Sequence, residues 1–369
     1  AGNAGTGTTN SNNYAIDTLR PTATIVVADT ALKVGETSLV TITFSEAVTG
    51  FTNADLSIAN GTLSSVSSAD GGLTWTATFT PTSSVEDTTN LITLDNTGVT
   101  DAAGNAGTGT TNSNNYAIDT RPPTVAITPD AASLKAGETA TLTFTFSEDV
   151  GTSFSADDIS VSGGTLGALT RVSGTVYTAV FTPTPGSTAD GVVSVGSGTF
   201  TDAAGNANTD GEDTNNAVTL AVDTRPPTVA ITPDVASLKA GETTTLTFTF
   251  SEDVGTSFSA DDISVSGGTL GALTRVDATH YTAVFTPTPG STANGVVSVA
   301  SGTFADAAGN ANADGADVDN TATLTVDTAR PSIVITADKA NLTTGETSIL
   351  TFALSEAAND FTAADITVT

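Results

Sequence analysis

The sequence is poor in the residues that most often carry chemistry. It contains no cysteine and no methionine, and only one histidine and one tryptophan among 369 residues. The absence of cysteine excludes disulfides, thiol nucleophiles and thiolate metal ligands. Lysine and arginine are also scarce, with 10 against 40 aspartates and glutamates, so the formal net charge is −30. A field of that sign repels nucleic acid and anionic membrane surfaces, and it attracts cations.

Signatures of catalysis and of membrane insertion are missing as well. No apolar run approaches the roughly 20 residues that span a bilayer, so we expect no direct membrane insertion in this segment. The sequence has no His-Glu-x-x-His, no Gly-Lys-(Ser/Thr) phosphate loop and no serine-histidine-aspartate set. The lone histidine, His280, occurs in one copy of the repeat described next, and we assign it no catalytic or metal role. We therefore predict that the protein is not an enzyme.

The sequence does contain a long tandem repeat. The phrase Asp-Thr-x-x-Pro returns with a period of about a hundred residues, the size of a domain that buries its own core. Residues 1–18 are identical to residues 103–120, so we expect the chain to be a window on a longer array. The predicted organisation is the end of one module at 1–18, whole modules at 19–119, 120–223 and 224–327, and the start of a further module at 328–369.

Strand signals are clearest in the second module. Residues 139–146 alternate small polar and apolar side chains with period two, and no segment shows a helical period. Glycine, proline, asparagine and aspartate fill the gaps between such runs. About seven short strands in roughly a hundred residues predict an all-β, immunoglobulin-like β-sandwich without the usual cysteine pair. The other strands are expected at 125–127, 159–161, 166–169, 177–181, 193–195 and 218–222.

The candidate chemistry lies in acidic loops between these strands. If the strands are lettered A to G, the loops after strands B and F leave the sandwich at one end, where the linker also enters. We therefore expect Asp119 of the linker to approach the loop side chains of the second module. These side chains are Glu148, Asp149, Asp158, Asp202 and Asn206.

Carboxylates that converge without lysine or arginine partners repel one another unless a cation neutralises them. Oxygen ligands favour a hard ion, above all Ca²⁺, whereas Mg²⁺ requires stricter geometry and Zn²⁺ or copper prefers nitrogen or sulfur. We predict a Ca²⁺ site in each copy. The equivalent side chains are Asp17, Glu46, Asp55, Asp101 and Asn105 in the first module, Asp223, Glu252, Asp253, Asp262, Asp306 and Asn310 in the third, and Asp327, Glu356 and Asp365 in the last.

Each of these motifs also has a purely structural interpretation. The Asp-Ala-Ala-Gly-Asn stretch is a tight turn by itself, with aspartate capping amides and glycine supplying a positive φ. Glu148 can be a solvated loop carboxylate, and Asp119 can cap the turn before the paired prolines. We interpret Arg171 and Arg275 as solvated strand residues and Lys135 as a solvated lysine in a polar turn before strand B.

The order of these motifs resembles a known family. An Asp-Thr-x-x-Pro linker, Ser-Glu after strand B, Asp-(Ile/Leu) at strand C and a terminal Asp-x-x-Gly-Asn are similar to the bacterial Ig-like modules of giant surface adhesins, including RTX-type adhesins and biofilm-associated proteins. The resemblance covers nearly the whole chain. It implies a cell-surface array whose junctions are stiffened by Ca²⁺, with linker ligands at Asp17, Asp119, Asp223 and Asp327. The RTX nonapeptide repeats are absent, so the extender region is the part that it resembles.

Two other functions stay open on the sequence. One is a self-assembling extracellular filament or matrix subunit in which a strand of one copy completes the next. The other is a glycan-binding repeat. The expected partners are the neighbouring modules of the same chain, and other copies in a fibre or matrix, with no nucleic acid among them.

Overall fold

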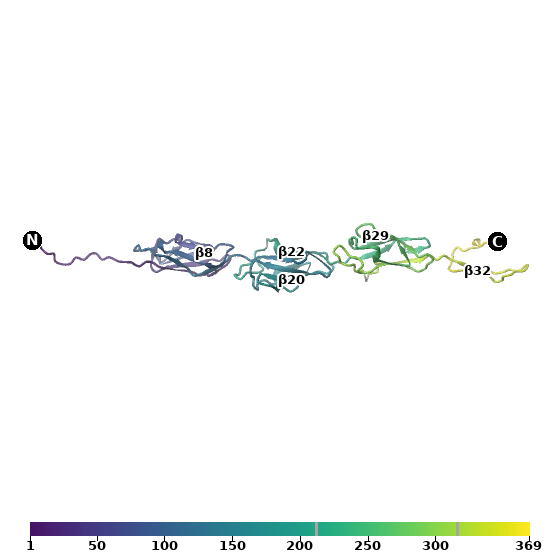
Figure 1. Ribbon diagram of the computed structural model, residues 1–369, viewed down its shortest axis with the longest axis horizontal. Coiled ribbons are helices and arrows are strands. Elements are labelled where there is room, and N and C mark those ends of the chain that lie inside the picture. The colour runs from purple at the N-terminus through teal and green to yellow at the C-terminus, as the bar shows by residue number, and fades with distance from the viewer. Residues whose placement is uncertain (211–212, 315–316) are drawn as a thin grey trace. The chain divides into compact units, whose positions relative to one another are not determined.

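The computed structural model describes residues 1–210, 213–314 and 317–369 (Figure 1). From Ala23 onwards its elements are β-strands and short 3₁₀ turns. The chain divides into two compact units, the first of Ala1–Ala132, Thr139–Thr182 and Gly191–Leu220, and the second of Ser133–Glu138, Pro183–Asp190 and Ala221–Thr369. Within the described ranges, no helix has the length and hydropathy needed to cross a bilayer.

The first module lies in the first unit. Its main sheet has the strand order β1-β3-β8-β6, with β7 beside β8, and shorter sheets have the orders β12-β10-β5, β2-β13-β9 and β11-β4. The strands are β1 (Ala23–Val27), β2 (Ala31–Leu32), β3 (Ser38–Phe44), β4 (Val48–Thr49), β5 (Leu56–Ile58), β6 (Gly61–Leu63), β7 (Ser67–Ser68), β8 (Thr74–Pro81), β9 (Glu86–Asn90), β10 (Ile92–Asp95), β11 (Thr100–Asp101), β12 (Thr110–Asn112) and β13 (Tyr116–Asp119), with 3₁₀ turns η1 (Asn53–Asp55) and η2 (Asn96–Gly98).

The second module has the strand orders of an immunoglobulin-like sandwich. One sheet runs β14-β16-β20-β18, with β19 beside β20, and the other runs β15-β22-β21-β17, which correspond to strands A-B-E-D and A′-G-F-C. The elements are β14 (Val125–Pro129), β15 (Ser133–Lys135), β16 (Ala140–Phe146), η3 (Ala156–Asp158), β17 (Ile159–Ser162), β18 (Gly164–Leu166), β19 (Thr170–Arg171), β20 (Val176–Pro183), β21 (Gly191–Val195), η5 (Thr214–Asn216) and β22 (Ala217–Asp223).

The third module, in the second unit, repeats this topology with the orders β23-β25-β29-β27 and β24-β31-β30-β26. Residues 328–369 add one antiparallel pair, β32 with β33. The elements are β23 (Val229–Pro233), β24 (Ser237–Lys239), β25 (Thr244–Phe250), η6 (Ala260–Asp262), β26 (Ile263–Ser266), β27 (Gly268–Leu270), β28 (Thr274–Arg275), β29 (His280–Pro287), β30 (Gly295–Val299), β31 (Thr321–Asp327), β32 (Ile333–Ala337), β33 (Leu350–Leu354) and η7 (Ala363–Asp365).

The prediction of an all-β, immunoglobulin-like sandwich is confirmed, with two local corrections. The fourth strand, expected at 166–169, is β18 and ends at Leu166, because the Gly-Ala pair that follows has low strand propensity. Ser133–Lys135, expected to be a polar turn, forms β15 and pairs in parallel with β22. Three residues with the single apolar side chain of Leu134 are too short for an alternating pattern to be visible in the sequence.

Apolar packing carries the core, since the chain has no cysteine. In β3 the side chains of Val40, Ile42 and Phe44 alternate with polar neighbours and are almost fully buried. In the second module the rings of Phe146 and Phe154 meet edge to face with their centroids 4.8 Å apart. Such aromatic pairs add to the burial of their area.

Tertiary partners decide whether a given sequence forms a strand. In residues 103–120 the side chains of Tyr116 and Ile118 are 0% and 1% exposed on β13, which pairs with β2 and β9. In the identical residues 1–18, Tyr14 and Ile16 are 74% and 76% exposed and belong to no strand. Local propensity is therefore insufficient to make this segment a strand, and hydrogen bonding to neighbouring strands is needed as well.

We expect Phe79→Ala to lower the free energy of unfolding of the first module by about 3–5 kcal/mol, because it leaves a cavity in a close-packed core. Phe79 is fully buried, and its ring lies edge to face with Tyr116. Trp75, the one tryptophan, lies on the same strand and reports on this module alone in a urea titration followed by fluorescence. Thr78→Ala, at the exposed neighbour, is the control and should change stability by less than about 0.5 kcal/mol.

Candidate metal site

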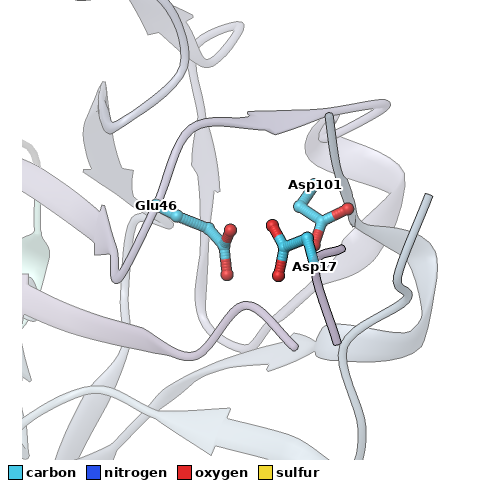
Figure 2. A group of neighbouring side chains, drawn as sticks. All are labelled: Asp17, Glu46 and Asp101. Carbon is cyan, nitrogen blue, oxygen red and sulfur yellow. The ribbon is translucent and has the colours of Figure 1, made fainter. Parts of the chain in front are cut away.

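Three carboxylates converge in each of the three whole modules, at the end where the linker enters. The structure brings together Asp17, Glu46 and Asp101, then Asp119, Glu148 and Asp202, and then Asp223, Glu252 and Asp306. We call each set a carboxylate triad. Within a triad, one carboxylate oxygen from each residue lies within 4.8 Å of the others. In Figure 2 the carboxylates of Glu46 and Asp17 face each other, and the carboxylate of Asp101 lies beside that of Asp17. Each triad lies wholly within one compact unit.

Three separate elements supply the triad of the second module. Asp119 is the last residue of β13, and so it belongs to the preceding module. Glu148 follows the end of β16 by two residues, and Asp202 begins the turn after β21. The expectation that linker, B–C loop and F–G loop meet at one end of the sandwich is thus met for these three side chains.

Hydrogen bonds within the turn at 202–206, which we call the F–G turn, hold Asp202 in place. The Asn206 backbone N–H donates to Asp202 Oδ1 over 2.8 Å, and Asn206 Nδ2 donates to Asp202 Oδ2 over 2.7 Å. Gly205 has a φ of +87°, which glycine adopts without strain. The tight-turn interpretation of Asp-Ala-Ala-Gly-Asn is confirmed, and Asp202 is only 5% exposed.

The same F–G turn recurs in the other two modules. Asn310 donates from its backbone and side chain to Asp306, and Asn105 does the same to Asp101, all over 2.8 Å. The linker aspartate caps its own turn, because the Arg121 backbone N–H donates to Asp119 Oδ1 over 3.2 Å. The capping role that the sequence allowed for Asp119 is therefore present together with its place in the triad.

The triad glutamates are in an unfavourable electrostatic position. Burial, with the nearby charges of Asp119 and Asp202 in support, raises the pKa of Glu148 to about 7. Its Oε1 is buried and has no hydrogen-bond partner. Burial, with the charges of Asp101 and Asp17 in support, raises the pKa of Glu46, and burial, with the charges of Asp223 and Asp306, raises that of Glu252. Among the residues that the structure describes, no ion pair within 4.0 Å includes a triad carboxylate.

Two other predicted ligands of the second module lie outside its triad. Asp149 forms an ion pair with Arg171 over 2.9 Å. Asp158 accepts hydrogen bonds from the Ser155 backbone N–H and hydroxyl, and so closes a capping box around η3. The expectation that the loop acids lack basic partners is therefore wrong for Asp149.

The other copies repeat these two arrangements. Asp253 forms an ion pair with Arg275. Both arginines are exposed strand residues, as expected, and each also pairs with an aspartate that the sequence did not indicate. The cross-strand register of β19 with β20, and of β28 with β29, places the guanidinium groups, and the sequence pattern did not reveal that register. The capping role is shared by Asp55, Asp262 and Asp365.

The last copy has no complete triad in the described part of the chain. Asp327 ends β31 and Glu356 follows β33, at the positions that correspond to Asp119 and Glu148. Residues 328–369 contain no Asp-x-x-Gly-Asn turn that would add the third carboxylate.

The predicted ligand Asn206 has another set of partners, which the sequence did not reveal. Its Nδ2 donates to the backbone oxygen of Asp119 over 3.0 Å, and its Oδ1 accepts from the backbone N–H of Val34 over 2.8 Å. Val34 lies 172 residues earlier in the chain. It belongs to the turn between strands A′ and B of the preceding module. A backbone N–H carries no residue signature, so no pattern in the sequence indicates this contact.

The arrangement offers three oxygen ligands and no nitrogen or sulfur. Such a set fits a hard divalent cation, and Ca²⁺ completes its shell with carbonyls and waters. The buried, unpartnered Glu148 Oε1 is an observation in favour, because a buried carboxylate oxygen without a partner is costly. The molecule is thus an array of immunoglobulin-like modules with an acidic triad at the entry of each whole module.

The chain belongs to the bacterial Ig-like domain family, whose model matches residues 17–118, 119–219, 223–323 and 327–369. No curated protein matches it. Among solved structures, the Escherichia coli adhesin FdeC is 18% identical with a TM-score of 0.34, and the alignment covers 83% of this chain and 96% of FdeC. The bacterial integrin-binding protein invasin is 14% identical with a TM-score of 0.34, over 91% and 68%. The titin I9–I11 tandem is 10% identical with a TM-score of 0.27, over 83% and 98%.

The raised pKa of Glu148 leads to a prediction for the chain without divalent cations. The pKa of about 7 in the folded state exceeds the ordinary value of 4.5, so the folded state favours the protonated form. The contribution of Glu148 to the free energy of unfolding of the second module should therefore be largest below pH 4.5. It should fall as the pH rises to 7. Thermal unfolding in EGTA across this range measures the effect. Glu148→Gln should flatten the profile, whereas Asp157→Asn, at an exposed acid on η3, should leave it unchanged.

Proposed function

We propose that the chain is an extender segment of a giant bacterial surface adhesin or extracellular fibre, in which Ca²⁺ at the module junctions rigidifies the array. The modules are those at 19–119, 120–223 and 224–327. The RTX-type adhesins and biofilm-associated proteins are the relatives that this architecture fits best. The proposal places the segment outside the cell, where it serves adhesion or biofilm formation by reach and not by catalysis.

One observation carries the proposal: in the second and third modules the triad takes one carboxylate from the preceding module. Asp119 comes from β13 of the first module, and Glu148 and Asp202 come from the second. Asp223, from β22 of the second module, meets Glu252 and Asp306 of the third in the same way. A cation held by all three residues links two modules, whereas a ligand site inside one module would not.

The proposed site acts through charge. Without a cation, repulsion among the triad carboxylates favours any movement of the linker that separates Asp119 from Glu148 and Asp202. A bound Ca²⁺ supplies the positive charge that removes this repulsion. The linker contributes to stiffness as well, because Pro122 and Pro123 restrict its backbone. Reach then grows with the number of modules.

We expect the chain, after removal of divalent cations, to bind Ca²⁺ and to melt at a higher temperature when it is bound, because a ligand of the folded state stabilises that state. Isothermal titration and calorimetric melting measure the two effects. Absence of any response to millimolar Ca²⁺ would refute the proposed site. Solution X-ray scattering of the chain with and without Ca²⁺ measures rigidity. If Ca²⁺ raises the melting temperature but leaves the scattering profile unchanged, it stabilises the modules and its role in rigidity is refuted.

A pair of adjacent acids provides a sharper test of which residues bind. Glu148→Gln should remove the Ca²⁺ site before the second module, and the titration should show fewer sites with the remaining ones unchanged. Asp149→Asn is the matched control, because Asp149 is the next residue but is paired with Arg171 outside the triad. Equal effects of both substitutions would indicate a general loss of negative charge and not a specific site.

A further inference from the structure

The F–G turn of each of the last two whole modules contacts the preceding module through one amide side chain. Asn206 Oδ1 accepts a hydrogen bond from the Val34 backbone N–H over 2.8 Å. Val34 lies in the turn at 33–36, which a hydrogen bond from the Glu36 N–H to the Lys33 oxygen closes over 3.1 Å. We call this turn, and its equivalents at 135–138 and 239–242, the A′–B turn. Both residues of the contact belong to the first compact unit.

The contact is repeated, with the same atoms, between the second and third modules. Asn310 Oδ1 accepts from the Ala136 backbone N–H over 2.7 Å, and Asn310 Nδ2 donates to the Asp223 backbone oxygen over 3.0 Å. Both residues lie in the second unit, in which the turn Ser133–Glu138 of the second module groups with the third module. Asn206 and Asn310 are 2% and 3% exposed, whereas Asn105, in the same turn of the first module, is half-buried.

The glycine of the F–G turn marks how closely the two turns approach. A Cβ on Gly205 would lie 3.2 Å from Lys33 Nζ, and a Cβ on Gly309 would lie 3.2 Å from Lys135 Nζ. Gly104, the equivalent in the first module, has a φ of +93° but no atom within 4 Å of such a Cβ. The close approach therefore belongs to the contact between modules and not to the turn itself.

We propose that the F–G turn is a docking element for the A′–B turn of the preceding module, and that Asn206 and Asn310 are its positioning residues. We call this contact between the F–G turn and the A′–B turn the latch. It rests on the proposed extender function, because it serves to hold neighbouring modules of an array together. It needs no cation. In this role the asparagine oxygen is bonded to the preceding module, so it is a latch rather than a member of the metal shell.

The chemistry of the position explains why an asparagine suits it. The two donors of its Nδ2 group are used on Asp202 Oδ2 and on the Asp119 backbone oxygen, and its Oδ1 accepts from Val34. A side chain with both donors and an acceptor is required. Aspartate has no donor when ionised, and it would add a charge beside Asp202. Alanine would leave the buried donors and acceptors of both turns without partners.

The test uses the full chain, which has no cysteine of its own. Thr43, Thr145 and Thr249 are exposed and equivalent positions on β3, β16 and β25, so cysteines there carry spin labels without entering the core. Pulsed electron paramagnetic resonance then measures the distribution of distances between two spin labels. The pair at 43 and 145 spans the first junction, and the pair at 145 and 249 spans the second. All measurements are made in EGTA and repeated in Ca²⁺. The parent chain is expected to give a distribution in EGTA that is narrower than those of the variants below, and Ca²⁺ should narrow it further.

The decisive variant removes the donor from the preceding module and leaves the F–G turn intact. Val34→Pro deletes the N–H at a turn position that is followed by Gly35 with a φ of +79°, where proline fits a type II turn. In EGTA it should broaden the 43–145 distribution and leave the 145–249 distribution unchanged. Ala136→Pro should do the reverse. Ala240→Pro, in the third module, is the control and should broaden neither.

A second pair of variants approaches the contact from its other side. Asn206→Ala should broaden the 43–145 distribution in EGTA and speed hydrogen exchange of the Val34 amide, which lies in a module that the substitution does not touch. Asn105→Ala removes the same intra-turn hydrogen bonds from the first module, and it should change neither measurement.

The outcomes separate the latch from the Ca²⁺ site. If the parent distributions are broad in EGTA and narrow only in Ca²⁺, the latch is overturned and the metal proposal survives. If they are narrow in EGTA, insensitive to Ca²⁺ and broadened by Val34→Pro, the latch stands and the proposed role of Ca²⁺ in the rigidity of the junction fails. If Val34→Pro and Asn206→Ala both leave the 43–145 distribution unchanged in EGTA, these hydrogen bonds do not hold the junction.

Discussion

The arrangement of each junction depends on the pair of hydrogen bonds between the aspartate and the asparagine of the F–G turn. In the second module, Asn206 donates to both oxygens of Asp202 from its backbone and its side chain. This interaction holds the buried Asp202 carboxylate near the linker and holds Asn206 Oδ1 where it accepts a hydrogen bond from the preceding module. The triad and the contact with the A′–B turn share this pair, because Asp202 belongs to the triad and Asn206 to the contact.

The magnitude of the repulsion among the triad carboxylates supports the proposed cation. Two unit charges at the 4.8 Å limit of a triad repel by about 3 kcal/mol at an effective dielectric constant of about 20, and by about 1 kcal/mol in water. Folding brings three carboxylates together, and burial first, then the charges of Asp119 and Asp202, raise the pKa of Glu148. A repulsion of this size is comparable to the energy of a few hydrogen bonds. It can loosen a junction without unfolding a module.

The sequence was sufficient for the repeat, the sandwich and the approach of the linker aspartate to the acidic loops, and insufficient for the selection of the three carboxylates that meet and for the partners of the other side chains. Alternation located β16 and β20 because each buries one face. The sandwich topology, which places the B–C and F–G loops at the end where the linker enters, predicted the approach of Asp119 to Glu148 and Asp202. The ion pair of Asp149 with Arg171 depends on the register between β19 and β20, which alternation does not determine. The bond of Asn206 to a backbone N–H 172 residues away leaves no trace in either sequence segment.

The latch and the metal site are chemically distinct, but they share residues, so their energies are not expected to add. Asp119 takes part in both, through its backbone oxygen on Asn206 and through its carboxylate in the triad. Asp202 likewise accepts from Asn206 and faces Glu148. Interactions in one network couple when they share a partner. A docked A′–B turn holds Asn206, and through it Asp202 and the linker, in the arrangement of the triad, so under both proposals the latch prepares the site that a cation would neutralise.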